Sequence, residues 1–278
     1  MDLKKINKLS GSVLIIAGSD PSGGAGIQAD LKTVTSLGAY GMTAITALTI
    51  QNTMGVSSIF DIPVNIVQKQ IECCISDIKV DVIKIGMMHN AKLIYGISET
   101  LFKNIKNNNK VKIVLDPVMV AKGGQRLLEI EAINVLKTFI NNFNPILTPN
   151  IPEAEILTGI KIKNLVDMEI VGKEIIKLGA SEVILKGGHL DKNIINDVLI
   201  DTNSCYTLET VKLETTHTHG TGCTMSSALA AGLAQSLNIK DAFERAHYYV
   251  QKAIKSAPLL GNGNGPINHC HSISGFVS

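Results

Sequence analysis

Short apolar runs alternate along the chain with longer stretches in which apolar residues recur every three or four positions. Residues 13–16 are typical of a buried strand, and the apolar spacing over residues 27–37 is typical of a helix that Gly38 ends. Further strands are predicted at about 42–49, 82–86, 111–115, 146–147 and 183–186, and further helices at about 63–78, 91–105, 132–140, 152–157 and 168–178. This regular alternation predicts an α/β fold with a mostly parallel, doubly wound central sheet and helices on both faces.

The pattern changes between residues 194 and 213, where short β-type runs lie on either side of the turn-forming segment 201–204. We predict an antiparallel meander there, followed by two final helices at about 224–236 and 241–256. No internal repeat and no linker rich in proline or glycine divides the sequence. Residues 1–278 are therefore expected to form a single domain, in which residues 1–11 are a flexible N-terminal extension.

The composition provides enough apolar material for a buried core, since 45% of the residues are hydrophobic and 18% are charged. The 26 basic and 24 acidic residues leave a formal net charge of +2, so neither nucleic acid nor a membrane surface is indicated as a partner. The chain has no tryptophan and only 4% aromatic residues, which disfavours base stacking on single-stranded nucleic acid. A small-molecule substrate is the better expectation.

The cysteines and the apolar runs indicate the compartment in which the protein works. Five cysteines are present and no two have Cys-x-x-Cys spacing, so neither a disulfide framework nor a zinc site is expected. The histidine pairs 217/219 and 269/271 do not complete a usual metal-ligand spacing either. No apolar run reaches the roughly 18 residues that cross a membrane, and the N-terminal run is too short for a secretion signal. These features predict a cytoplasmic protein.

The strongest chemical signal is the segment 218–224, Thr-His-Gly-Thr-Gly-Cys-Thr, which leads directly into an apolar helix. Its glycines allow a ligand to approach the backbone closely, and unpaired N–H groups at a helix start attract anions such as phosphate. Cys223 lies at this start, where we expect its thiol pKa to fall below the usual value of about 8.5, giving a base or nucleophile near neutral pH. The alternatives are an ordinary glycine-capped helix and a buried, inert cysteine.

Two common nucleotide-binding motifs do not occur in the sequence. The glycine-rich segment 18–26 follows a predicted strand and precedes a predicted helix, but its glycines do not have G-x-G-x-x-G spacing. No G-x-x-x-x-G-K-[S/T] segment is present, which disfavours a P-loop NTPase. A phosphate site in this chain therefore has to be built from other residues.

Charged residues follow several of the predicted strands. Asp116 and Glu153 each come after an apolar strand, and two carboxylates at one edge of a sheet are enough to bind Mg²⁺ together with phosphate and water. Lys186 ends a further strand, where a cation would suit a phosphate group. Helix capping or a favourable interaction with a helix dipole explains either acid taken alone.

These motifs occur together in a known family. The chain resembles the hydroxymethylpyrimidine/phosphomethylpyrimidine kinases of thiamine biosynthesis, which lie within the ribokinase-like superfamily. The resemblance covers about residues 12–271, and the long motif at residues 17–32, A-G-S-D-P-S-G-G-A-G-I-Q-A-D-L-K, is highly specific. The other matching segments are 45–48, 51–53, 84–87, 115–119, 148–150, 152–154, 185–189, 219–224 and 263–267.

The resemblance implies a three-layer ribokinase-like sandwich that uses ATP and Mg²⁺ and works as a homodimer. Its substrate would be an aminopyrimidine with a hydroxymethyl group, phosphorylated first to the monophosphate and then to the diphosphate. By position in the motifs, Gln51 would recognise the aminopyrimidine edge. Asp30, Met87 and Gly18 would line the same pocket, and residues 120–124 would form a mobile flap over it.

The resemblance assigns the phosphoryl-transfer residues in the same way. Gly220, Thr221 and Gly222 would form the anion hole, and Cys223 would be the base that removes the hydroxyl proton. The remaining residues would be Asp116 and Glu153 for Mg²⁺, and Lys186 and Asn150 for the phosphates of ATP. Positioning and charge stabilisation achieve most of phosphoryl transfer, so these groups are sufficient. The second step transfers phosphate to a phosphate, which has no hydroxyl proton to lose, so Cys223 should matter less there.

Cys223 also restricts the branches of the superfamily to which the chain could belong. Most sugar-kinase relatives have an aspartate at this position, whereas some pyridoxal kinases share the cysteine, so this residue does not settle the substrate. The main alternative is therefore a pyridoxal kinase, or a bifunctional enzyme, although Gln51 favours the pyrimidine. A catalytically silent nucleotide-binding regulator is disfavoured because every expected catalytic position is filled.

Overall fold

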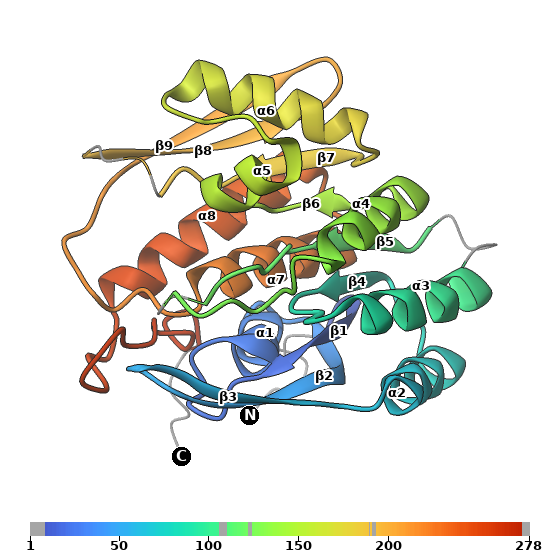
Figure 1. Ribbon diagram of the computed structural model, residues 1–278. Coiled ribbons are helices and arrows are strands. Elements are labelled where there is room, and N and C mark those ends of the chain that lie inside the picture. Colours follow the sequence, from blue (N-terminus) through green and yellow to red (C-terminus); the bar gives the residue numbers. More distant parts are fainter. Residues whose placement is uncertain (1–8, 106–109, 122–123, 189, 191–192, 274–278) are drawn as a thin grey trace, which may run out of the picture.

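The computed structural model describes the chain except for residues 1–8, 106–109, 122–123, 189, 191–192 and 274–278. Within the described residues, nine strands form one sheet in the spatial order β3-β2-β1-β4-β5-β6-β7-β8-β9 (Figure 1). The strands are β1 (Ser12–Ser19), β2 (Tyr40–Asn52), β3 (Gly55–Asp61), β4 (Val82–Ile85), β5 (Lys112–Leu115), β6 (Ile146–Leu147), β7 (Glu182–Leu185), β8 (Ile194–Ile200) and β9 (Cys205–Val211). The helices are α1 (Gly26–Ser36), α2 (Val64–Asp77), α3 (Ala91–Ile105), α4 (Ala132–Phe143), α5 (Ile151–Thr158), α6 (Leu165–Lys177), α7 (Thr221–Ala234) and α8 (Ile239–Lys255). None of these described helices is long and apolar enough to cross a membrane.

The centre of the sheet is parallel and its two edges are antiparallel. Strands β2, β1, β4, β5, β6 and β7 pair in parallel, since helical crossovers carry the chain back between them. Strand β3 adds antiparallel to one edge, and the hairpin β8–β9 adds antiparallel to the other. The predicted mostly parallel sheet and the predicted meander after residue 194 are both confirmed.

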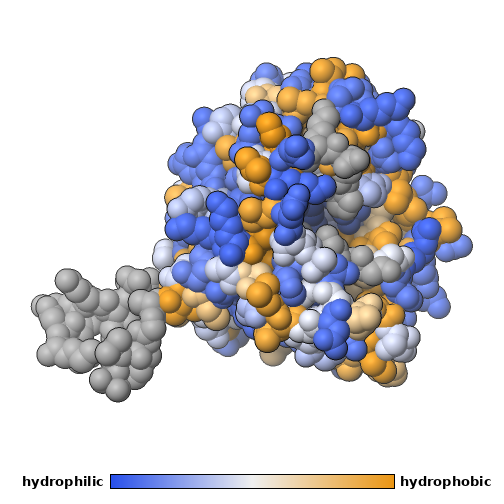
Figure 2. Space-filling view, turned by 90° about the vertical axis from the view of Figure 1, so that its left-hand side faces the viewer, coloured by the Kyte–Doolittle hydropathy of each residue, from blue (hydrophilic) through white to orange (hydrophobic). Residues whose placement is uncertain are grey.

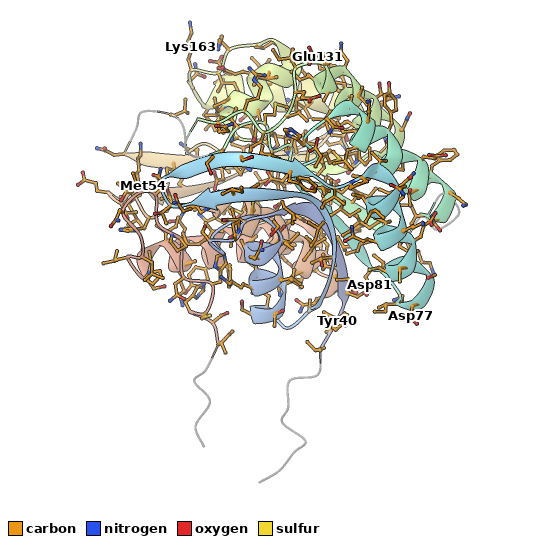
Figure 3. The ribbon with its side chains drawn as sticks, turned by 60° about the horizontal axis from the view of Figure 1, so that its bottom comes forward. Tyr40, Met54, Asp77, Asp81, Glu131 and Lys163 are labelled. Carbon is orange, nitrogen blue, oxygen red and sulfur yellow. The ribbon has the colours of Figure 1, made fainter. Side chains whose placement is uncertain are left out.

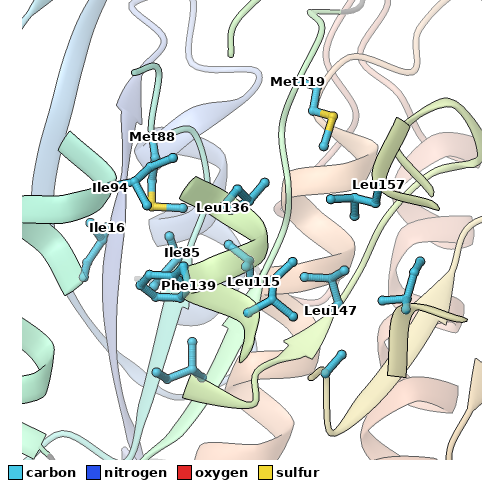
Figure 4. Close-up of a cluster of buried hydrophobic side chains, with 14 of the residues drawn as sticks. Ile16, Ile85, Met88, Ile94, Leu115, Met119, Leu136, Phe139, Leu147 and Leu157 are labelled. Carbon is cyan, nitrogen blue, oxygen red and sulfur yellow. The ribbon is translucent and has the colours of Figure 1, made fainter. Parts of the chain in front are cut away.

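Helices cover both faces of the sheet because strand side chains alternate between the two faces. Leu14 and Ile16 of β1 belong to the larger core, which packs against helices α2 to α6 and is shown in part in Figure 4. Val13 and Ile15 of the same strand belong to the second core, against α1, α7 and α8. All four side chains have no exposed surface. The architecture is therefore the three-layer sandwich that the sequence predicts.

The hairpin of β2 and β3 is the largest departure from the sequence-based prediction. The apolar pattern predicts a strand only at about 42–49 and nothing before residue 63, whereas β2 continues to Asn52 and returns as β3. Its outer part carries exposed apolar residues, among them Ile50 (64% exposed) and Phe60 (65%), and Met54 lies at its tip (Figure 3). A strand of this kind has no continuous buried face, so its hydrophobic pattern does not reveal it.

The start of the described chain is held against the body of the molecule. The N–H of Tyr40 donates to the carbonyl of Gly11, and the N–H of Ser10 donates to the carbonyl of Gly38. A Cβ on Gly11 would lie 2.5 Å from the backbone oxygen of Ala234. Residues 1–8 of the predicted flexible extension lie outside the described residues. Residues 10 and 11, at its predicted end, contact the body of the fold, and the flexibility of the extension stays a prediction.

Candidate active site

The loops that follow the central strands lie together along one edge of the sheet, because parallel strands place their carboxyl ends on the same side. Figure 2 views the molecule from this side and shows hydrophilic residues around a hollowed region. The N-terminus of α7 reaches the same edge, next to Lys186 after β7 and Asp116 after β5. The structure therefore brings together the anion-binding, cationic and acidic residues that the sequence predicts.

The start of α7 allows close approach to its backbone. Gly220 precedes the helix in the left-handed conformation (φ 82°), and a Cβ there would lie 1.8 Å from the carbonyl oxygen of Gly24. A Cβ on Gly222 would lie 3.2 Å from Nζ of Lys186, so no side chain separates the first turn from that cation. The helix begins at Thr221, three residues earlier than the sequence pattern predicts. The N–H groups of this first turn are suited to bind an anion.

Cys223 lies in the first turn of α7 with its side chain half-buried. The backbone N–H of Gly26 faces the sulfur, and the neighbouring charged groups are Lys84, Asp30 and Asp116. Burial raises the pKa of the Cys223 thiol to about 12, although the positive charge of Lys84 opposes this rise. The predicted fall of this pKa is therefore wrong, because the loss of hydration outweighs the charge of Lys84 and the hydrogen bond from Gly26.

A fully buried ion pair lies beside Cys223. The Nζ of Lys84, on β4, is 2.7 Å from Oδ2 of Asp30 on α1, and neither side chain has exposed surface. The hydroxyl of Ser227 on α7 donates to Oδ1 of Asp30 at 2.6 Å. The carboxylate of Asp30 is enclosed by these two partners, and its role in lining the substrate pocket stays a prediction.

Lys84 lies beside the candidate site, and no role is predicted for it from the sequence. Its signal is a lysine inside β4, whose residues are otherwise apolar and are all buried. A lysine is rarely fully buried unless a carboxylate pairs with it. Burial lowers the pKa of Lys84, but the charge of Asp30 and further negative groups raise it above its usual value. The side chain therefore stays protonated and carries a positive charge to the inner side of Cys223.

A second ion pair joins the ends of β5 and β7. Nζ of Lys186 is 2.8 Å from Oδ1 of Asp116, and the hydroxyl of Thr148 donates to the same oxygen at 3.3 Å. The other oxygen of Asp116 lies 3.7 Å from the position that a Cβ on Gly222 would occupy. The predicted cation and the predicted carboxylate thus face the first turn of α7 together, paired with each other.

Glu153 lies near this pair and also caps a helix. Its carboxylate accepts the N–H of Asn150 at 2.8 Å, and its own N–H donates to the side chain of Asn150 at 2.9 Å, which is a capping box at the start of α5. The helix-capping role considered for this acid is confirmed. Burial raises the pKa of Glu153 to about 7, with Lys186 opposing the rise and Asp116 adding to it.

The acidic groups at this edge fit a hard cation. Among the described residues, no three or more His, Cys, Asp or Glu side chains group into a metal site. Mg²⁺ needs only one or two carboxylates when phosphate oxygens and water complete its coordination. Asp116 and Glu153 supply two carboxylates beside the cation Lys186, so the donor chemistry fits a magnesium ion that binds together with phosphate.

A pocket opens beside the turn of the β2–β3 hairpin. The residues lining it are Gln51, Asn52, Thr53, Met54, Gly55, Val56, Ala121, His219 and Asn264. Met87 belongs to a small apolar cluster whose outer members Val56 and Ala121 line this pocket. A Cβ on Gly18 would lie 3.3 Å from the sulfur of Met87. The structure therefore brings Gln51, Met87 and Gly18 to one region, as predicted.

Asp20 and His219 form a buried pair next to Gln51, and neither residue has a role predicted from the sequence. Nε2 of His219 is 2.8 Å from Oδ2 of Asp20 and 3.2 Å from the side-chain amide of Gln51. Burial tends to raise the pKa of Asp20, but hydrogen bonds from His219 and Ser22 lower it below its usual value. The available sequence signal is an aspartate directly after a buried strand, at the head of a glycine-rich segment.

The C-terminal segment braces the anion-binding loop. The N–H of His219 donates to the carbonyl of Gly265 at 3.0 Å, and the hydroxyl of Thr224 lies 3.0 Å from Nε2 of His269. Ile267, between these two contacts, is only 2% exposed. Burial lowers the pKa of His269 to about 4, so this ring is neutral near pH 7. Residues 265–269 therefore pack against the start of α7 without adding a charge to it.

Residues 122–123 of the predicted flap lie outside the described residues. On either side of them, Val120 pairs with Arg126 in an isolated bridge, and Ala121 lines the pocket. The flanking residues therefore lie at the margin of the Gln51 pocket. The mobility of this flap stays a prediction.

The amino-acid sequence is similar to those of curated kinases. The model of the phosphomethylpyrimidine kinase family matches residues 20–268. The hydroxymethylpyrimidine/phosphomethylpyrimidine kinase of Bacillus subtilis is 42% identical over 257 residues, which are 92% of this chain and 93% of that protein. The thiamine biosynthesis bifunctional protein ThiED of Geobacter sulfurreducens is 46% identical over 259 residues, or 93% of this chain, and the chain spans 52% of that longer protein.

Solved structures with the same fold include kinases for two kinds of substrate. A phosphomethylpyrimidine kinase from Clostridium difficile has a TM-score of 0.77 and 44% identity, and the match covers 87% of this chain and 99% of that one. A pyridoxal kinase from Staphylococcus aureus in complex with AMP-PCP has a TM-score of 0.84 and 35% identity, with 94% of each chain covered. These similarities confirm the predicted ribokinase-like fold.

Proposed function

The chain belongs to the phosphomethylpyrimidine kinase family, and from this membership we propose that it phosphorylates hydroxymethylpyrimidine to the monophosphate and then to the diphosphate. It is a phosphotransferase, and an ATP analogue bound to a pyridoxal kinase of the same fold supports ATP as the phosphoryl donor. The products belong to thiamine biosynthesis, for which a relative is named.

One observation carries the site assignment: residue 222 is glycine, and a Cβ there would lie 3.2 Å from Nζ of Lys186, so the first turn of α7 lies directly against the Lys186–Asp116 pair. The two groups are too close together to hold a phosphoryl group between them, and a phosphoryl group bound beside them would contact the backbone N–H groups and the ammonium group together. Such an arrangement stabilises the charge of the transferred group, which is the main requirement of phosphoryl transfer. This arrangement supports a model in which the phosphoryl acceptor binds in the Gln51 pocket and the nucleotide binds on the Lys186 side of α7.

The remaining roles follow from this arrangement. We assign the base to Cys223, and the anion hole to Gly220, Thr221 and Gly222. Asp116 and Glu153 would hold Mg²⁺, which neutralises phosphate charge when bound. Lys186 would bind the ATP phosphates, and Asn150 would assist them from the start of α5, where it also holds Glu153.

Turnover of ATP with three separate acceptors tests the proposed function. We expect phosphorylation of hydroxymethylpyrimidine and of its monophosphate, with the diphosphate as the final product. Turnover of pyridoxal alone would overturn the proposal. Turnover of the monophosphate without the free alcohol would restrict it to the second step.

Pyridoxal phosphorylation is a second candidate function. The Staphylococcus aureus pyridoxal kinase aligns over 94% of this chain. Pyridoxal and hydroxymethylpyrimidine are both small heteroaromatic compounds with a primary alcohol, so one site could accept both. Gln51 favours the pyrimidine, because a planar amide can donate to a ring nitrogen and accept from the amino group beside it.

Replacing Gln51 by leucine is expected to raise KM for hydroxymethylpyrimidine about tenfold to a hundredfold, or roughly 1–3 kcal/mol, because the polar edge of the substrate loses its partner. KM for ATP should not change, since the nucleotide binds on the other side of α7. If Gln51 only caps its strand, both KM values should rise together with a fall in melting temperature. An unchanged KM for the pyrimidine would refute the assignment.

Removing one of the two carboxylates, by Asp116→Asn or Glu153→Gln, should raise the Mg²⁺ concentration that gives half-maximal rate by about tenfold or more. The double variant should lose less than the product of the two single losses, because both groups serve one ion. Initial rates over a series of Mg²⁺ concentrations measure this. A double variant with the Mg²⁺ dependence of the wild type would exclude the role.

We also propose that the chain folds as a single domain and works as a cytoplasmic homodimer. The β2–β3 hairpin supports a dimer because it exposes several large apolar side chains, which often mark protein interfaces. These are Leu48, Ile50, Met54 and Phe60. The cysteines, which are free in the structure, suit a reducing compartment.

A further inference from the structure

The side-chain amide of Gln51 can be placed in two ways that differ only by exchanging its oxygen and nitrogen. The groups around the amide decide which of the two is correct, because a hydrogen bond needs one donor and one acceptor. Two neighbours test it: Nε2 of His219, 3.2 Å from the amide nitrogen as placed, and Oγ1 of Thr49, 3.2 Å from the amide oxygen.

The proton on His219 is fixed by Asp20. Oδ2 of this carboxylate is 2.8 Å from Nε2 of His219, and it also accepts the N–H groups of Gly24 and Ala25 at 3.2 and 2.8 Å. An ionised carboxylate can only accept, so Nε2 of His219 carries a hydrogen. An amide nitrogen facing this N–H would place two donors together. The single hydrogen on Nε2 points to Asp20 at the shorter distance, and an oxygen of Gln51 at 3.2 Å can share it as a second acceptor. The atom of Gln51 that faces His219 is therefore its oxygen.

The other end of the amide gives the same answer independently. Thr49 has a single hydroxyl hydrogen, and it donates to the carbonyl of Ser19 at 2.9 Å. The hydroxyl oxygen is then left as an acceptor for the second neighbour. The atom of Gln51 that faces Thr49 is therefore the nitrogen. With its oxygen toward His219 and its nitrogen toward Thr49, the amide shares the Nε2–H with Asp20 and donates to the hydroxyl oxygen. In the opposite orientation its nitrogen faces the ring N–H, and Thr49 can donate to its oxygen only by giving up the carbonyl of Ser19.

The imidazole of His219 is held so that it cannot turn away. It is 6% exposed, and a Cβ on Gly24 would lie 2.4 Å from its Cδ2 atom, so the glycine backbone packs directly against the ring. Its backbone N–H is bound to Gly265. Asp20 is 2% exposed. The N–H that Asp20 holds beside Gln51 is thus fixed in identity and in position.

We propose that Asp20 and His219 are positioning residues that hold the Gln51 amide with its oxygen toward His219 and its nitrogen toward Thr49. This inference rests on the proposed function for its ligand. One lone pair of the oxygen and one N–H remain available to the pocket. The amino group of an aminopyrimidine would then lie on the His219 side, and its ring nitrogen would lie on the Thr49 side. A ligand with the reversed order, a carbonyl beside a ring N–H, would be rejected because the amide cannot turn over.

The hydrogen on His219 can be tested without any substrate. Nitrogen chemical shifts of the labelled imidazole at about pH 8, above the usual histidine pKa of about 6.5, distinguish the two neutral tautomers. The His219→Gln variant identifies the signal by its disappearance. We expect a hydrogen on Nε2. A neutral ring with its hydrogen on Nδ1 would overturn the proposal, whatever reaction the enzyme catalyses.

The effect on selectivity is measured by calorimetric binding of two ligands. One is hydroxymethylpyrimidine, and the other is its analogue with a carbonyl in place of the amino group and a hydrogen on the adjacent ring nitrogen. The wild type should prefer the amino compound by at least about a hundredfold, because the reversed edge leaves polar groups unpaired on both sides. His219→Leu and Thr49→Val each free one end of the amide, and each should reduce this preference at least about tenfold.

Two controls separate orientation from a merely structural role. His219→Gln offers an amide N–H at the same place and should retain most of the preference. Thr46→Val removes another buried hydroxyl of β2, one that donates to the carbonyl of Met87 and does not contact Gln51, and it should leave the preference unchanged. If His219→Leu and Thr49→Val weaken both ligands by the same factor, the proposal is overturned. If the wild type binds neither pyrimidine, the proposed function fails. The orientation of the Gln51 amide is then tested by the His219 tautomer measurement alone.

Discussion

Replacing Cys223 by alanine is expected to leave the fold intact and to slow the first phosphorylation by about 10²–10⁴, the range for loss of a general base. The side chain is small and half-buried in the first turn of α7, so alanine removes the sulfur without disturbing the packing. Phosphorylation of the monophosphate should lose much less, because its acceptor is a phosphate oxygen. Single-turnover rates with each acceptor, together with the melting temperature, measure the difference.

The pH dependence of the same reaction provides the control. Burial raises the pKa of Cys223 to about 12, so the thiolate fraction is small near pH 7 and grows tenfold with each pH unit. The first phosphorylation should therefore rise with pH up to at least about pH 9. In Cys223→Asp the carboxylate is already ionised in this range, and the rise should disappear. Equal losses in both steps for the alanine variant would instead place Cys223 in the anion hole or in packing.

Replacing Lys186 by methionine is expected to lower kcat for both phosphorylations by about 10²–10³, the usual loss when one preorganised group that stabilises developing charge is removed. Its Nζ lies against the first turn of α7, where no side chain shields it from a bound phosphoryl group. Unlike the loss of Cys223, this loss should be similar in the two steps, because both transfer the same phosphoryl group from ATP. Steady-state rates at saturating ATP measure it.

A matched surface variant shows whether the effect is local. Lys177 is largely exposed and pairs with Glu174 on its own helix, so Lys177→Met should leave both rates unchanged. Lys186→Met also leaves Asp116 without its cation, so the melting temperature has to be recorded. A folded Lys186→Met enzyme with the wild-type kcat would contradict the assignment of this lysine to the phosphates.

The parallel centre of the sheet is predictable because its strands are short, continuous apolar runs between amphipathic helices. Residues 13–16 have apolar side chains on both faces, and both faces are covered in the structure. The β2–β3 hairpin is different, because it leaves the body of the protein and exposes residues such as Ile50 and Phe60. Hydrophobic periodicity in a sequence reflects which residues are buried, so an exposed strand has little periodicity by which to predict it.

Those parts of the candidate site can be predicted whose residues are recognisable within one short segment of the sequence. The glycines before α7 and the residues at the ends of β5 and β7 are found from their position after strands. The pairing of Lys84 with Asp30 cannot be predicted in this way, because the two residues are 54 positions apart and neither segment indicates the other as its partner. The same limit explains the error in the pKa of Cys223, since burial depends on elements distant in the sequence.

The contacts of residues 265–269 with the start of α7 have a consequence for the order in which the chain is made. Chains emerge from the ribosome N-terminus first, and folding begins before synthesis ends. Strands β1 to β9 are complete in the nascent chain by residue 211, whereas Gly265 and His269, which brace His219 and Thr224, are made only after α7 and α8. The sheet can therefore assemble while the phosphate loop still lacks these contacts, and the loop gains its support only after residue 269 has emerged.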